Sequence, residues 1–263
     1  MTNKLLTIVF INKNGGAVFE KALKAAQQLS SRILVVDSGS TDESKSYADE
    51  VQAQWVEREW PGDFSNQRNF AQSLVNTEWV LFLDSDEILE KKLILNISKT
   101  LNNQPDKEVA FQFFRKNLLL GHRLRFGSMS SDSILRLYRP TEAHWEGCVH
   151  EKLVPFKGKK LQITTIKGFA IHHSYESFED WFKKSENYTS LWASLNKNKK
   201  CTASTIIFKT LFAFIKSYFF QLGILDGRWG GISSFLHSAY TFKKYAKLYD
   251  LIKKDETFTH RVG

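Results

Sequence analysis

The chain has 263 residues, of which 42% are hydrophobic and 14% aromatic, with only 4 prolines. This length suits one large domain or a domain with an appended module, and the composition excludes a disordered or low-complexity protein. The formal net charge of +9 is unevenly distributed: residues 1–180 hold 23 basic and 23 acidic residues, whereas residues 181–263 hold 14 basic and 5 acidic ones. The positive excess therefore lies in the C-terminal third, which predicts different roles for the two parts.

The cysteines and the N-terminus indicate the compartment. Cys148 and Cys201 lie far apart, so we expect reduced thiols in a reducing compartment rather than a disulfide framework. The apolar run at residues 5–11 is too short for a secretory signal. The sequence has no stretch of about 18 uninterrupted apolar residues, so no transmembrane helix is expected. The expected location is the cytoplasm.

Strands and helices alternate along the first hundred residues. Apolar runs predict buried strands at residues 5–11, 33–36, 54–56 and 79–83. Helical spacing of apolar residues predicts helices at residues 19–29, 65–75 and 89–101. Ser40 and Glu43 match a capping box that would open a further helix. This alternation predicts an α/β fold with a mostly parallel, doubly wound sheet flanked by helices.

Beyond about residue 105 the pattern loosens. Strands are predicted at residues 109–114 and 134–138, with loops and short strands between and after them. Three helices are predicted at residues 176–196, 203–222 and 232–252. The chain should therefore end in a basic helical extension.

Two aspartates follow the most apolar strand directly. Residues 79–83 run into Asp84-Ser85-Asp86, and Asp37 ends another buried strand. Ligands bind at the carboxyl ends of strands in such sheets, so Asp37 and Asp84 should face one crevice. Two close carboxylates need a cation to stay ionised, and a divalent metal shared with a substrate phosphate suits them. The alternative is a surface turn without a ligand.

Several motifs match a known family in order and approximate spacing. They are the N-terminal strand, Val35–Asp42, Gln67–Asn69 and Leu83–Glu87. On these residues the chain resembles the family 2 glycosyltransferases, which have the Rossmann-like GT-A fold. A second set resembles the branch that glucosylates the heptose of the bacterial lipopolysaccharide inner core: Trp60–Gly62, Leu135–Arg139, Gly147–Glu151 and Tyr240–Lys247. The first loop departs from that branch, because Asn12-Lys13-Asn14 stands where Asn-Glu-Glu is common.

The resemblance implies an inverting, metal-dependent transfer of a hexose, glucose from UDP-glucose, to a heptose of the lipopolysaccharide or lipooligosaccharide inner core. It implies Mg²⁺ or Mn²⁺ as cofactor and a GT-A catalytic domain over residues 1–175. Residues 1–105 would form the nucleotide-sugar half, residues 106–175 the acceptor half, and residues 176–263 the basic helical extension. Three alternatives stay open: a galactosyltransferase, an inactive carbohydrate- or lipid-binding module, and a nucleotidyltransferase, for which Asn14-Gly15-Gly16 is a poor phosphate loop.

The resemblance also assigns binding roles. Asp86 would bind the metal, and Asp84 would support the metal or the ribose. Asp37 would bind the base or ribose, although an aspartate before Gly39 can equally cap the turn. Arg68 offers a planar cation to the base or diphosphate, with a surface ion pair as the alternative. Phe10 and Asn12 would line the base pocket.

Inverting transfer needs one general base. Glu151 is the predicted base, since it follows His150 in a segment that matches the branch, and Asp132 and then Glu146 are the alternatives. His150, His172 and His173 lack zinc-site spacing, so we expect one of them to contact the metal or diphosphate, or to be structural.

The C-terminal part combines apolar and basic residues. Residues 206–220 are strongly apolar but include Lys209 and Lys216, and residues 243–247 add three lysines beside aromatic residues. We expect this extension to bind the anionic inner face of the cytoplasmic membrane, where a lipid-linked oligosaccharide acceptor would lie. The alternative is packing on the catalytic domain. No nucleic-acid motif is visible, so no nucleic-acid partner is expected.

Overall fold

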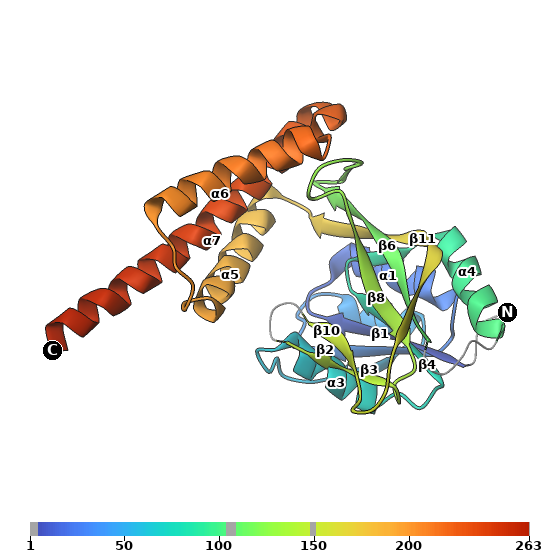
Figure 1. The fold of residues 1–263 in the computed structure, drawn as a ribbon. Helices are drawn as coiled ribbons and strands as arrows, with labels where there is room; N and C mark the ends of the chain where they lie inside the picture. The colour runs from blue at the N-terminus through green and yellow to red at the C-terminus, as the bar shows by residue number, and fades with distance from the viewer. Residues whose placement is uncertain (1–4, 104–108, 148–150, 263) are drawn as a thin grey trace. The chain divides into compact units, whose positions relative to one another are not determined.

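The structure is a computed structural model that describes residues 5–103, 109–147 and 151–262, with side chains as far as residue 254. The chain divides into two compact units (Figure 1). The first comprises Met1–Lys116 and Asp132–His173, and the second comprises Asn117–Ser131 and Ser174–Gly263.

Four parallel strands form one half of the sheet in the first unit. They are β1 (Leu6–Asn12), β2 (Ile33–Asp37), β3 (Gln54–Glu57) and β4 (Trp79–Asp84), in the order β3-β2-β1-β4. β1, β2 and the apolar part of β4 are buried throughout, as expected for strands covered on both faces. In the register, Asp37 lies beside Asn12 and Asp84 lies beside Ile11. The carboxyl ends of β2 and β4 therefore flank the end of β1.

The other half of the sheet contains antiparallel pairs. Its strands are β5 (Glu87–Leu89), β6 (Val109–Leu119), β8 (Ser131–Tyr138) and β11 (Gln162–Tyr175). β7 (His122–Arg123), which belongs to the second unit, pairs antiparallel with the last residues of β6. β8 pairs antiparallel with β4, and β5 pairs antiparallel with β11. A separate hairpin pairs β9 (Ala143–Glu146) with β10 (Lys152–Pro155). The predicted α/β sheet flanked by helices is confirmed. Its parallel strands lie within residues 1–105, for which a nucleotide-sugar-binding role stays a prediction.

Helices cover both faces of the parallel strands. α1 (Gly16–Gln27), α2 (Ser44–Glu50) and α4 (Lys91–Asn102) share one core with the side chains on one face of β1, β2 and β4. α3 (Phe64–Ser73) contributes Ala71 and Phe70 to a second core on the opposite face. Alternate strand residues enter each core, because successive side chains of a strand point to opposite faces.

Two local predictions differ from the structure. The capping box at Ser40 and Glu43 is wrong: α2 begins at Ser44, and Glu43 makes no side-chain cap. The Ser40 oxygen instead accepts hydrogen bonds from the Asn14 backbone amide at 2.7 Å and the Asn12 side chain at 3.1 Å, so its lone pairs are not available to cap a helix. β11 is a continuous strand of 14 residues where only loops and short strands were predicted, because much of it is exposed and lacks an apolar pattern.

The second unit is helical. Its main helices are α5 (Phe178–Leu195), α6 (Ala203–Ile215) and α7 (Gly227–Val262). Between α6 and α7 lie a π-helical turn, η1 (Lys216–Phe220), and a 3₁₀ turn, η2 (Gly223–Asp226). α6 and α5 both pack against α7 (Figure 1). Cys201 is a buried free thiol in this unit, and Cys148 lies outside the described residues.

One segment of the second unit, Ala203–Phe220, is long and apolar enough to cross a membrane by length and composition, with a mean hydropathy of 1.3. Only 11% of it is buried inside the structure. The segment includes Lys209 and Lys216, which is why a count of uninterrupted apolar residues does not identify it.

Candidate functional site

The candidate site at the ends of β1, β2 and β4 begins with the turn after β2. Asp37 is 1% exposed, and its Oδ2 accepts hydrogen bonds from the backbone amides of Gly39 (2.9 Å) and Ser40 (2.7 Å). Its Oδ1 accepts from the Asn12 amide group at 2.9 Å and from the Ser40 hydroxyl. A carboxylate has about four lone-pair sites, so in this structure Asp37 is fully used in holding the turn. The predicted turn-capping role is observed, and a nucleotide contact stays a prediction.

Asn12 and Phe10 precede this turn on β1. The Asn12 amide group donates to both Asp37 and Ser40, at 2.9 and 3.1 Å, while its Oδ1 is buried without a hydrogen-bond partner among the described residues. Phe10 is fully buried and packs edge to face on Phe19, with ring centroids 5.4 Å apart. The prediction that Phe10 lines a base pocket is therefore not supported. Alternate side chains of β1 point to the same face of the sheet, and Phe10 lies with Leu6 and Ile8 in the core on the α1 side. Asn12 keeps that role as a prediction.

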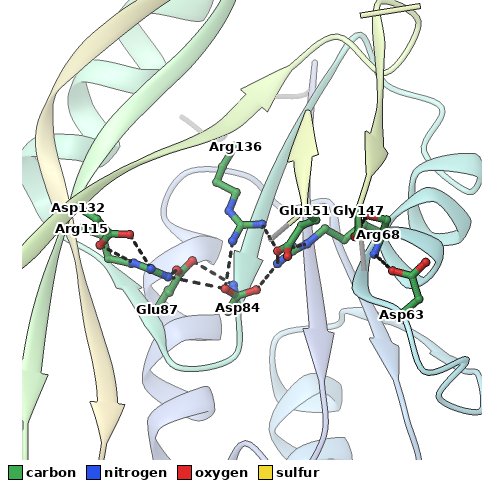
Figure 2. A network of polar contacts seen from close by, with 10 residues as sticks. Asp63, Arg68, Asp84, Glu87, Arg115, Asp132, Arg136, Gly147 and Glu151 are labelled. Carbon is green, nitrogen blue, oxygen red and sulfur yellow. Dashed lines mark hydrogen bonds and ion pairs between the residues drawn. The ribbon is translucent and has the colours of Figure 1, made fainter. Parts of the chain in front are cut away.

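Asp84 lies at the centre of a network of arginines (Figure 2). Its Oδ1 accepts from Arg68 Nη2 at 2.6 Å, and its Oδ2 accepts from Arg136 Nη2 at 3.3 Å. Arg115 Nη1 lies 3.9 Å from the same Oδ2. Burial alone would raise the pKa of Asp84, but the charges of these arginines outweigh it and hold that pKa well below its usual range. Asp84 is therefore an ionised partner of guanidinium groups.

α3 places Arg68 in this network. Asp63 caps the helix by accepting from the Ser65 amide at 2.8 Å, and the Ser65 hydroxyl donates to the Gly147 carbonyl at 2.6 Å (Figure 2). Asn69 exchanges two hydrogen bonds with the backbone of Trp145, at 2.8 and 2.9 Å. These bonds fix α3 against β9, so Arg68, which is 1% exposed, points along the sheet toward Asp84.

Glu87 and Arg115 connect this centre to Asp132 (Figure 2). Glu87 is fully buried; it accepts from Arg115 Nη1 at 2.7 Å and from the Asp84 amide at 3.1 Å. Burial raises the pKa of Glu87, and the neighbouring Asp84 charge acts in the same direction. Asp132, at 42% side-chain exposure, accepts from Arg115 Nε (3.0 Å) and Nη2 (2.7 Å). The alternative base is thus held in a two-bond ion pair.

Glu151, the predicted base, joins the network from the other side. Its Oε1 accepts from Arg68 Nη2 at 3.2 Å and Nε at 3.3 Å, and it lies 3.6 Å from Arg136 Nη1. Its side chain is 15% exposed. The structure therefore brings Glu151, Arg68 and Asp84 into contact. The sequence predicted a role for each of these residues but not their contact. His150 lies outside the described residues.

Asp86 is the carboxylate best suited to a cation. Its Oδ1 is buried and has no hydrogen-bond partner among the described residues, and His172 Nε2 lies 3.4 Å from its Oδ2. Carboxylate oxygen is a ligand that Mg²⁺ and Mn²⁺ prefer. Both oxygens of Asp84, by contrast, contact guanidiniums. Within the described part of the chain, no group of three or more histidine, cysteine or acidic residues is arranged to hold a metal, so protein ligands alone would be few.

Sequence reasoning missed three members of this site. Glu87, Arg115 and Arg136 make ion pairs that span 28 residues between Glu87 and Arg115 and 52 between Asp84 and Arg136. One local signal was available: an arginine inside an apolar strand, as Arg136 is between Leu135 and Leu137, needs a buried anion. Glu146 lies elsewhere, in contact with His144 at 2.8 Å.

Comparison with known proteins places these residues in a family. The model of glycosyl transferase family 2 matches residues 7–174. An uncharacterized glycosyltransferase of Rickettsia prowazekii is 27% identical over 266 residues, covering 96% of this chain and 89% of that protein. An uncharacterized glycosyltransferase of Rickettsia bellii is also 27% identical, covering 95% and 88%.

The chain is also similar to two solved structures. One is Staphylococcus aureus TarS, residues 1–349, with a TM-score of 0.44 and 12% identity over 98% of this chain and 92% of that chain. The other is glucosyl-3-phosphoglycerate synthase from Mycobacterium tuberculosis in complex with Mn²⁺, UDP and phosphoglyceric acid, with a TM-score of 0.44 and 15% identity over 72% and 77%. The family match alone covers more than half of the chain. This protein therefore belongs to glycosyl transferase family 2 and is a glycosyltransferase.

Proposed function

We propose that this glycosyltransferase is inverting and metal-dependent, and that it transfers glucose from UDP-glucose to a heptose of the lipopolysaccharide inner core. Residues 1–175 would be the catalytic domain and residues 176–263 the basic extension. One observation supports this proposal most: two aspartates with different surroundings follow one buried strand. Asp86 has a carboxylate oxygen without a hydrogen-bond partner among the described residues, whereas Asp84 contacts arginines. A metal ion bound to Asp86 and the arginines around Asp84 would both stabilise the negative charge of the diphosphate leaving group.

The two aspartates would divide the work. Asp86, with His172 beside it, would hold Mg²⁺ or Mn²⁺, and Asp84 would hold the arginines that face the donor. The metal, when bound, supplies positive charge to the departing diphosphate. Asn12 and Asp37, which form the turn after β1 and β2, would position the nucleoside.

Glu151 is the proposed general base. Transfer requires a carboxylate that takes the proton of the acceptor hydroxyl. The oxygen of that hydroxyl then forms a bond to the sugar carbon as the bond from this carbon to the diphosphate breaks. Glu151 lies beside the arginines that would face the diphosphate, whereas both oxygens of Asp132 are held by Arg115. Asp132 is the second candidate.

The acceptor is proposed to be lipid-linked, and the protein to lie on the inner face of the cytoplasmic membrane. One side of α6 and η1 exposes apolar residues at helical spacing: Ile207, Phe208, Leu211, Phe212, Ile215 and Phe219. Lys209 and Lys216 are exposed beside them and can reach lipid headgroups. The second lysine cluster is different: Lys243 and Lys247 pair with Glu186 of α5 and hold its pKa at about 2. The membrane contact is thus assigned to α6 and η1.

Calorimetry of UDP-glucose binding tests the donor and the metal. We expect binding to the wild type only with Mn²⁺ or Mg²⁺, loss of that binding in Asp86→Ala, and weaker competition by UDP-galactose. Tighter binding of UDP-galactose would change the donor assignment. If no UDP-sugar binds with metal present, the proposed donor class is wrong.

A further inference from the structure

Arg68 and Arg136 form a pair of buried guanidinium groups that come from two different elements, α3 and β8. Arg68 comes from α3 and is 1% exposed, and the Arg136 side chain comes from β8 and is 9% exposed (Figure 2). Both lie over the Trp145 ring, with Cζ atoms 5.2 and 5.3 Å from its centroid. The Nη1 atoms of both arginines are buried and have no hydrogen-bond partner among the described residues. The two guanidinium groups therefore lie over the same ring, and each has N–H donors that no hydrogen bond of the described residues uses.

Two carboxylates neutralise this pair, and they hold it unequally. Asp84 contacts Arg68 at 2.6 Å, a short charge-assisted bond, and contacts Arg136 at 3.3 Å. Glu151 contacts Arg68 at 3.2 and 3.3 Å and Arg136 at 3.6 Å, all through the one oxygen Oε1. Good bonds of this kind measure about 2.7–2.9 Å. Glu151 is therefore a loose counter-ion of both arginines, whereas Asp84 holds Arg68 tightly.

A buried guanidinium cannot be left without an anion, since unpaired buried charge is strongly destabilising. Guanidinium groups also match phosphate oxygens in two-bond geometry better than they match a single carboxylate oxygen. The loose partner is the one that an incoming anion would replace.

We propose that Arg68 and Arg136 form a diphosphate-binding site over Trp145, which the Glu151 carboxylate occupies until the diphosphate of the donor displaces it. This inference rests on the proposed function. Displacement releases Glu151 as a free carboxylate beside the bound donor, where it can accept the proton of the acceptor hydroxyl. Donor binding thereby makes the base available, and an acceptor that arrives first meets a base still paired with arginine.

The test uses the full chain and inorganic pyrophosphate and UDP as probes, with affinities measured by calorimetry at one fixed Mg²⁺ concentration. Glu151→Gln should bind pyrophosphate roughly tenfold more tightly than the wild type, since it removes one charge-assisted competitor. Arg136→Lys should bind it roughly tenfold more weakly, because a lysine cannot offer two parallel bonds. Glu78→Gln is the matched control: it removes a carboxylate from another arginine pair, that of Arg139 at 2.6 Å, and should leave the affinity unchanged.

Unchanged or weaker pyrophosphate binding by Glu151→Gln would refute the displacement, and so would an equal gain in Glu78→Gln. The UDP arm separates this inference from the proposed function. If Glu151→Gln gains affinity for pyrophosphate while UDP binds no more tightly than pyrophosphate in any variant, the anion site stands and the nucleotide donor is wrong. If UDP binds tightly but Glu151→Gln gains nothing, the donor stands and the displacement is wrong.

Discussion

Replacing Asp84 with asparagine should destabilise the protein, because the Asp84 carboxylate balances buried guanidiniums. Its oxygens lie 2.6 Å from Arg68 and 3.3 Å from Arg136, and its side chain is only 29% exposed. Asparagine keeps the shape but loses the charge, and its amide group would point a donor at a donor. Breaking a buried pair costs about 3–5 kcal/mol, and each bond to a charged group contributes about 1.5–3 kcal/mol. With part of the hydrogen bonding retained, we expect a loss of about 3 kcal/mol in the free energy of unfolding.

The same variant should change how stability depends on pH. The folded pKa of Asp84 is held well below its usual range, because the arginines outweigh the effect of burial. An unfolded aspartate titrates near pH ~3.9. A lowered folded pKa stabilises the protein above the unfolded value, and this stabilisation is lost as the pH falls toward the folded value. Between about pH 7 and about pH 3, the wild type should lose about 1 kcal/mol relative to Asp84→Asn.

Urea denaturation followed by tryptophan fluorescence, repeated across that pH range, measures both effects. Glu78→Gln is again the control, because Glu78 is 45% exposed and pairs with Arg139, so its loss should cost under about 1 kcal/mol. The reasoning fails if Asp84→Asn is as stable as the control at neutral pH. It also fails if the difference between wild type and Asp84→Asn is the same at both ends of the range.

Three further outcomes are expected. Glu151→Gln should lower kcat by about 10²–10⁴-fold while Asp132→Asn retains most of it, as steady-state assays would show; the reverse order would make Asp132 the base. Gly168→Ala should cost about 2–4 kcal/mol in thermal or urea unfolding, because Gly168 has φ +123° and an added Cβ would lie 2.8 Å from Leu93 Cα; wild-type stability would contradict this close approach. Phe208→Ser should weaken sedimentation with anionic vesicles several-fold without changing sedimentation in their absence; unchanged vesicle binding, or a change in oligomeric state instead, would assign the apolar face of α6 to another partner.

The parallel half of the sheet could be predicted from the sequence because its strands are buried on both faces. β1, β2 and β4 are continuous apolar runs, so their positions and the polar residues at their ends follow from the pattern alone. This is why the apolar pattern was enough to place Asp37 and Asp84 at one edge of the sheet. β11 shows the opposite case: its first residues are mostly exposed, and its place in the sheet comes from pairing with β6 and, at Ala170–His172, with β5.

The interior of the site could not be predicted, because its contacts join residues that no local pattern connects. Ser40 matches a helix cap locally, but its oxygen accepts from Asn12 and Asn14, which lie 28 and 26 residues earlier in the chain. Glu151 matches a free base in the sequence, whereas in the structure it neutralises Arg68, 83 residues earlier in the chain. Charge balance in a buried region is a property of the folded arrangement, so a candidate base chosen by motif still needs its partners located.

The two aspartates of the Asp-x-Asp pair should therefore separate in their effects on binding. Both Asp84 oxygens contact guanidiniums, whereas Asp86 has a buried oxygen without a partner among the described residues. A cation at the Asp86 Oδ1 breaks no hydrogen bond of the described residues, but it would have to compete with arginines for Asp84. Asp86→Asn should then lose the metal dependence of UDP-glucose binding in calorimetry, and Asp84→Asn should keep it despite lower stability. Equal loss of metal dependence in both variants would show that the arginines leave Asp84 when the cation binds, and that the arginine contacts belong to the ligand-free protein alone.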